Sequence, residues 1–140
     1  MHRCKRVLIV VSMFIISIFL LVMTAMVMNP LLRTESSIRN NLLRITPIGT
    51  NRNEVATAIN DVEGWSIRGF FGPVVLHPTL LTPTRSGQHD DRFPSVGVRS
   101  IEAHLGTYRL IIRVDVSAFF AFDENDELIE IFVRKQYDLP

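Results

Sequence analysis

The alternation of apolar and polar side chains from Tyr108 to Lys135 constrains the fold of this chain more than any other feature. Between residues 108 and 122 every even-numbered position is apolar, whereas Arg109, Arg113, Asp115 and Ser117 stand at odd positions. A period of two is typical of a strand with one buried face. The pattern resumes after the polar residues 123–126 with Ile129, Ile131 and Val133. The stretch therefore predicts a long strand, a turn and a second strand in an antiparallel hairpin.

Two helices are predicted ahead of this hairpin. The first covers Leu31 to Arg44, with Thr34 as a cap and an apolar stripe of Ile38, Leu42 and Ile45. The second follows Asn51, a second capping residue, and ends near Gly64, with apolar residues Val55, Ala58, Ile59 and Val62 at helical spacing.

Two shorter strands are expected at Trp65–Phe71 and Val98–Leu105, with a turn at Gly106–Thr107. The segment between them, at about residues 72–97, contains four prolines and predicts a long loop, in which only Val74–Leu76 suggests brief pairing. The predicted fold class is α+β: an N-terminal transmembrane helix, then two short helices packed on an antiparallel sheet of three to four strands, in the order ααβββ.

The run from Val7 to Met28 is apolar except for Ser12, Ser17 and Thr24. As a helix it would measure about 33 Å, enough for a hydrocarbon core of roughly 30 Å. Asn29–Pro30 ends the run. We therefore expect residues 1–30 to form a basic tip and a transmembrane signal anchor, and residues 31–140 to form the α+β domain.

Other interpretations of the run remain open. A cleaved signal peptide has a shorter apolar region, and Ala25–Val27 makes a poor cleavage site. A helix buried in a core is the third possibility. Because Arg3, Lys5 and Arg6 precede the run, an anchor would keep the amino terminus in the cytoplasm and place the domain in the periplasm or outside the cell.

Charge and cysteine content exclude several classes of protein. The chain has 15 Lys and Arg and 14 Asp and Glu; three of the basic residues precede residue 28, so the remainder has 12 against 14, a net charge of −2. Such a domain has no net attraction for nucleic acid. The single cysteine, Cys4, rules out an internal disulfide and a multi-cysteine zinc site. It is either an acylated juxtamembrane residue or an unmodified thiol.

Two patches resemble a known family. The stretch from Ile48–Gly49–Thr50 to Glu54–Val55, with Trp65 beyond its helix, and the ending Phe120 to Ile129 are similar to the SmpA/OmlA family of envelope proteins, across about residues 45–135. The resemblance implies a BLIP-like α+β fold and an envelope location. Two departures are the lack of a lipobox and the long segment between Phe71 and Val98.

Few residues in the sequence are candidates for metal binding or catalysis. The available metal ligands are His77, His89, Asp90, Asp91 and His104, without the spacing of a helical metal site. A metal-binding protein or an enzyme using His89, Asp90 and Asp91 is the alternative interpretation, against a solvated loop. The acids of residues 123–127 favour a hairpin turn over a calcium loop, which needs twelve residues. We expect no catalytic residue and no cofactor.

The leading hypothesis is a non-enzymatic envelope protein, anchored through residues 7–28, whose domain binds another envelope protein. The candidate contact residues are Ile111, Phe119 and Phe132, which the alternation places on the outer side of the hairpin. A structural domain that self-associates through a sheet edge is a further alternative.

Overall fold

The computed structural model describes residues 2–76, 81–83, 93–109 and 111–138. Contacts within the chain divide it into two compact units, Met1–Arg33 and Thr34–Pro140. The elements run in the order α1, a short 3-10 helix, α2, α3 and seven strands. An α+β class with helices preceding an antiparallel sheet is therefore confirmed.

The first unit consists of helix α1 (His2–Met28) and a 3-10 turn at Pro30–Leu32. Side chains of α1 are described from Val10 to Thr24, and all of these are exposed. Cys4 and the basic residues before Val7 have side chains outside this description. A helix of the length and apolarity required to cross a membrane is not found among the described residues, so the transmembrane part of the expected fold is not shown.

Both helices of the second unit begin at the predicted caps. The Thr34 side chain accepts a hydrogen bond from the Ser37 amide, and α2 runs Glu35–Ile45, so the expected start at Leu31 was too early. The Asn51 side chain accepts from the Asn53 amide, and α3 runs Arg52–Asp61. Capping oxygens satisfy amides that have no partner within a helix, which explains why cap chemistry located both starts.

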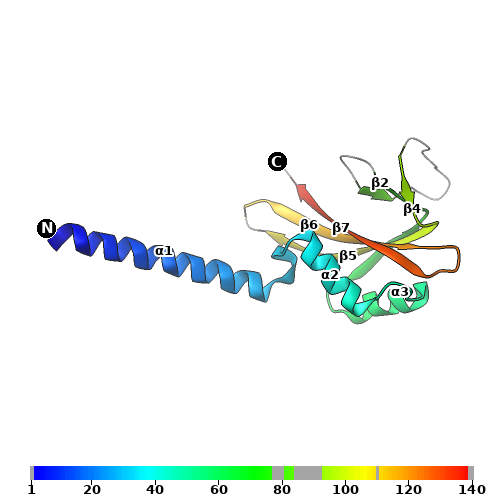
Figure 1. Ribbon diagram of the computed structural model, residues 1–140, viewed down its shortest axis with the longest axis horizontal. Coiled ribbons are helices and arrows are strands. Elements are labelled where there is room, and N and C mark those ends of the chain that lie inside the picture. The colour runs from blue at the N-terminus through cyan, green and yellow to red at the C-terminus, as the bar shows by residue number, and fades with distance from the viewer. Residues whose placement is uncertain (1, 77–80, 84–92, 110, 139–140) are drawn as a thin grey trace. The chain divides into compact units, whose positions relative to one another are not determined.

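The central sheet has four antiparallel strands in the order β1-β5-β6-β7. Their bounds are β1 Ser66–Phe71, β5 Arg99–Arg109, β6 Arg113–Phe122 and β7 Leu128–Asp138. Helices α2 and α3 lie on one face of this sheet (Figure 1). The core on that side contains Leu42 and Ile59 from the helices and Ile101, Phe120 and Ile131 from the strands, all fully buried or nearly so.

The long strand expected from Tyr108 onward is wrong, because β5 ends at Arg109 and the chain bends at Ile111 and Ile112 before β6 begins at Arg113. Gly106 and Thr107, the predicted turn, lie inside β5. The register between β5 and β6 shifts between His104 and Gly106, and Gly106 has a φ of +140° that accommodates this bulge. Apolar turn residues continue the alternation, which is why the sequence pattern concealed the turn.

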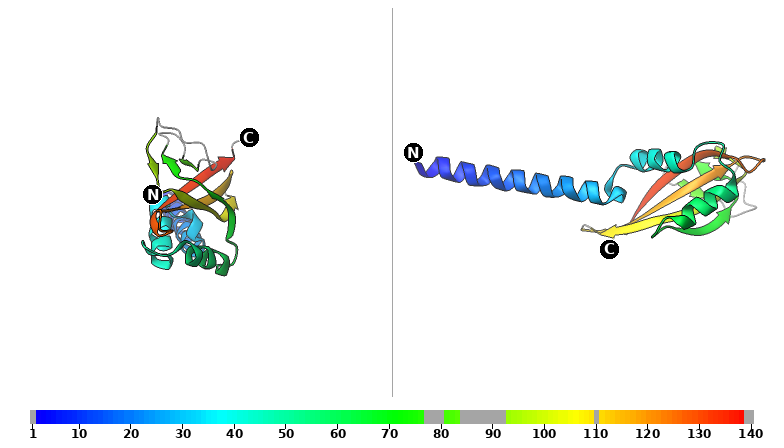
Figure 2. Two further views of the ribbon diagram at one scale, coloured as in Figure 1. Left: turned by 90° about the vertical axis from the view of Figure 1, so that its right-hand side faces the viewer. Right: turned by 90° about the horizontal axis from the view of Figure 1, so that it is seen from below.

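A second, three-stranded sheet occupies part of the segment expected to be a loop. Its strands are β2 Val74–Leu76, β3 Leu81–Pro83 and β4 Ser95–Val96, in the order β3-β2-β4. Figure 2 shows β2 on the side of the central sheet opposite to the helices. Val74 packs there against Phe119 and Ala121 of β6. This end of β6 is therefore buried on both faces.

Gly97 carries the chain from the small sheet to the central one. Its φ is +73°, and a Cβ atom at this position would lie 2.7 Å from the carbonyl oxygen of Phe122. The next residue, Val98, donates its amide to that same oxygen. Only glycine meets both the left-handed conformation and the close backbone approach.

Candidate functional site

The predicted contact residues do not form one surface. Phe119 is 0% exposed, and Phe132 is partly buried against the same cluster as Val74 and Phe119. Phe119 is a core residue and Phe132 packs against it, because the second sheet covers the face that the alternation assigned to solvent. Ile111 alone is exposed, at 92%, in the bend between β5 and β6.

The alternative metal or catalytic site lies outside the described residues. His77, His89, Asp90 and Asp91 all fall in the segments that the structure leaves undescribed. Among the described residues, no group of three or more His, Cys, Asp and Glu side chains is arranged to hold a metal ion. The hypothesis of a metal-binding protein or an enzyme therefore remains a prediction.

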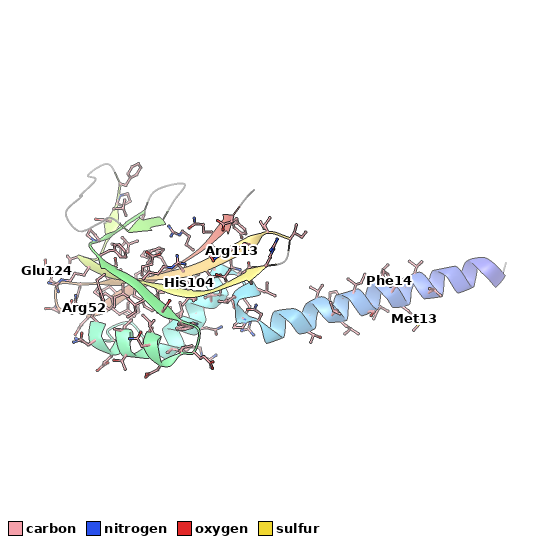
Figure 3. The ribbon with its side chains drawn as sticks, turned by 180° about the vertical axis from the view of Figure 1, so that it is seen from behind. Met13, Phe14, Arg52, His104, Arg113 and Glu124 are labelled. Atoms are coloured by element: carbon pink, nitrogen blue, oxygen red, sulfur yellow. The ribbon has the colours of Figure 1, made fainter. Side chains whose placement is uncertain are left out.

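A polar cluster lies on the face of the central sheet that also carries Phe119. We call it the outer-face cluster and define it as Arg68, Glu102, His104, Thr107 and Asp115. Glu102 and His104 are two residues apart on β5, and Glu102 pairs across the strands with Phe119. Adjacent strands and alternate residues bring these side chains to one face. In Figure 3 His104 lies in the middle of the sheet.

A chain of hydrogen bonds runs through the outer-face cluster from Arg68 to Asp115. An Arg68 nitrogen lies 3.0 Å from Nδ1 of His104, and Nε2 of that ring lies 3.5 Å from Oγ1 of Thr107. The Thr107 hydroxyl donates to the Asp115 carboxylate, and Asp115 is 3.6 Å from the Arg113 Nε. Because Arg68 is always a donor, Nδ1 accepts and the proton of the neutral ring lies on Nε2.

Electrostatics favour the neutral state of His104. Burial and then the neighbouring Arg68 guanidinium lower the pKa of His104 below its usual value, against the raising effect of Asp115. The hydrogen bond from Thr107, followed by the charge of Arg113, lowers the pKa of Asp115. The cluster therefore holds a neutral imidazole beside an ionised carboxylate at neutral pH.

Glu102 lies between two arginines, from β1 and β7: Arg68 is 4.0 Å and Arg134 is 3.9 Å from its carboxylate. Arg109 and Arg113 pair with each other at the end of the β5–β6 hairpin, far along the strands from Glu102, which pairs with Phe119. Arg134 also lies over the Phe119 ring, 4.9 Å from its centroid.

The arrangement of the outer-face cluster differs from that of a nucleophilic site. In such a site a base takes the proton of the hydroxyl and a third group orients the base. Here the hydroxyl of Thr107 donates to Asp115 directly, and His104 is held by a cation rather than by an acid.

The acidic turn between β6 and β7 is also occupied by structural contacts. Asp123 accepts hydrogen bonds from the amides of Asn125 and Glu127, and these bonds, chiefly that from Glu127, lower its pKa. Asp126 lies 2.7 Å from Arg99 and 3.5 Å from Arg52. The hairpin turn expected from residues 123–126 is confirmed.

One edge of the central sheet is covered by side chains from α2. The Arg39 Nε donates to the carbonyl of Ile131 and to Glu130, each at 3.0 Å, and Glu35 accepts the amide of Lys135. Further along, Thr50 and Gly49 bond to Leu128. Self-association through a sheet edge, one of the predicted alternatives, is therefore hindered at β7.

Exposed apolar residues gather around the connection between α2 and α3. We define the α2–α3 patch as Ile45, Ile48 and Ile129, each more than a third exposed. The Gly49 amide lies 2.7 Å from the Leu128 carbonyl, which places Ile48 and Ile129 on neighbouring segments. Ile45 was predicted to be a core residue; it is 51% exposed because the helix ends there. Sequence reasoning missed this patch, since Ile48 and Ile129 come from distant segments.

Comparisons with known proteins found nothing similar: the chain matches no protein-family model, no curated protein and no solved structure. The resemblance to the SmpA/OmlA family therefore rests on the sequence patches alone.

Proposed function

We propose that this chain is a membrane-anchored, non-enzymatic envelope protein whose α+β domain binds another protein. The anchor is α1, with the amino terminus in the cytoplasm and the domain in the periplasm or outside the cell. The exposed α2–α3 patch supports a binding role.

The observation that carries the proposal is the apolar surface of α1. The large apolar residues between Val10 and Met23 are each 44% to 72% exposed. Successive residues of a helix are about 100° apart, so these side chains cover its entire circumference. A helix that is apolar on all sides requires an apolar environment, and the basic residues before it fit the cytoplasmic end of a membrane span.

The anchor is tested by extraction and by protease protection. The intact chain should stay in the membrane fraction through a carbonate wash, and protease added on the outer side should remove the domain. Release of a soluble product that begins near residue 28 would contradict the anchor.

The proposed partner surface is the α2–α3 patch, in place of Phe119 and Phe132. Its three isoleucines lie close together, whereas the other exposed large apolar residues of the described domain, Phe70, Val98, Ile111 and Tyr137, come from other strands and bends. Ile48→Asp should abolish crosslinking to the partner in intact membranes while leaving the unfolding midpoint unchanged. Val98→Asp is the matched control, because Val98 is also an exposed aliphatic residue, outside the patch. Equal loss of crosslinking in both variants would contradict the assignment.

A further inference from the structure

The bend between β5 and β6 presents an apolar side chain between two arginines. Ile111 is 92% exposed, Arg109 ends β5 and Arg113 begins β6, and both arginines are exposed. Leu110, between them, lies outside the described residues. A single exposed isoleucine is common on protein surfaces, so its neighbours decide what it means.

Tyrosines and a lysine stand directly behind the tip. Tyr108 and Tyr137 both pair with Val114, on the two strands that flank β6. Tyr137 is more than half exposed. The Lys135 ammonium lies 5.4 Å from the centre of the Tyr108 ring. From the tip inward, the side chains are first apolar (Ile111), then cationic (Arg109 and Arg113), and then aromatic and cationic (the two tyrosines and Lys135).

This order matches the chemistry of a bilayer surface. Apolar side chains enter the acyl boundary, arginine and lysine bind phosphate groups, and tyrosine rings lie at the level of the headgroups. Long basic side chains can keep their charge in the headgroup layer while their stems follow the apolar residue.

Arg109 supplies the charge complementarity at the tip. Arg113 lies 3.6 Å from Asp115 and 3.9 Å from Asp138, so neighbouring carboxylates balance its charge. No carboxylate of a described residue forms an ion pair with Arg109. Its guanidinium is therefore the group best suited to a lipid phosphate.

The tip is at the end of the domain where the chain enters from α1. Glu35, the first residue of α2, accepts the amide of Lys135, which pairs with Val116 on β6. Thr34 follows Met28 by six residues, a reach of about 20 Å when extended. An anchored α1 would hold this end of the domain within that distance of the bilayer surface.

We propose that the β5–β6 tip, through Ile111 and Arg109, inserts into the headgroup layer of a phospholipid bilayer. The inference rests on the proposed anchor and adds a second membrane contact to it. Its partner is the phospholipid surface, with the isoleucine at the acyl boundary and the arginine on a phosphate.

Fluorescent labels in the full-length chain test the proposal. Cys4 is replaced by serine, and single cysteines at Ile111, Glu124 and Phe14 are labelled with a polarity-sensitive dye in separate samples. Glu124 is the control, because Arg113 and Glu124 lie at opposite ends of the domain (Figure 3). Each sample is reconstituted into phosphatidylcholine vesicles with and without phosphatidylserine. Lipids with a spin label near the headgroup are the quencher for positions 111 and 124, and lipids with a spin label deep in the acyl chain are the quencher for position 14.

Quenching at position 111 should exceed that at position 124 several-fold, should increase with phosphatidylserine, and should decrease with Arg109→Glu. Quenching at position 14 without quenching at 111 overturns the tip proposal and leaves the anchor intact. Absence of quenching at position 14 overturns the anchor itself. A blue shift at 111 without quenching by lipid identifies a protein contact and also overturns the proposal.

Discussion

Phe119 shows how one side chain connects the two sheets. It is fully buried between Val74 of β2 and the guanidinium of Arg134, on the face of β6 that carries polar residues elsewhere. A buried aromatic ring of this kind contributes both apolar area and a cation–π contact. The position is therefore essential to the packing of the small sheet on the central one.

Phe119→Ala should lower the free energy of unfolding by about 3–5 kcal/mol, because it leaves a cavity in a close-packed core. Ile111→Ala is the control, and its effect should stay within about 0.5 kcal/mol, as for other exposed positions. Urea unfolding followed by the fluorescence of Trp65, the single tryptophan, measures both. Similar midpoints for the two variants would contradict the buried assignment.

His104 makes stability depend on pH. In the unfolded chain its pKa is near 6.5, and in the folded domain burial and Arg68 hold its pKa lower. Between these two values the unfolded state binds more protons, so the free energy of unfolding increases with pH. The contribution is complete above the unfolded pKa and is lost as pH falls through the window.

His104→Gln should therefore flatten the dependence of unfolding free energy on pH just below 6.5. Urea unfolding at a series of pH values measures the slope, and the NMR titration of His104 in the parent protein reports the folded pKa. A variant with the same slope as the parent protein would show that other groups determine the dependence.

Among the elements, α2 has two tasks. Its apolar stripe of Ile38 and Leu42 is buried, and its polar residues Glu35 and Arg39 bond to β7. Edge strands expose unpaired backbone groups to which other chains can add, and side chains that bind those groups block such addition. The helix thus contributes to the core and also covers an edge.

Arg39→Ala should cost about 1.5–3 kcal/mol, the range for hydrogen bonds that involve a charged group, and should promote aggregation through β7. Arg44→Ala is the matched control on the same helix, since Arg44 is exposed and forms none of these bonds to β7. Urea unfolding and light scattering measure the two effects. Equal stability and equal scattering of both variants would contradict a capping role for Arg39.

Elements specified by local chemistry could be predicted from the sequence. Thr34, Asn51 and the turn at residues 123–126 act on backbone groups a few residues away, so their side-chain types were sufficient. The bend at Ile111 and Ile112 consists of apolar residues, and β2 to β4 are only two or three residues long, too short for a periodic signal. The outer-face cluster depended on a bulge and on contacts between distant strands, which alternation alone does not predict.

At the scale of the molecule, contacts divide the chain after Arg33. The buried apolar residues of the described chain all lie in the second unit, from Ile38 onward. This division predicts that the second unit is thermodynamically independent of the first.

A protease site inserted after Arg33 tests this independence. Cleavage should release a fragment that begins at Thr34 and unfolds at the same urea concentration as the intact chain, according to Trp65 fluorescence. Intact chain treated identically, without the inserted site, is the control. A lower midpoint for the fragment would show that residues before Thr34 stabilise the domain.

The bond between Arg39 and Glu130 joins positions 91 residues apart in the chain. During synthesis α2 is made well before β7, so Ile38 and Leu42 cannot pack against β7 until that strand has also been made. Contacts of such long range slow folding. A chain truncated before residue 128 would lack β7, and the stripe of Ile38 and Leu42 would stay uncovered by that strand.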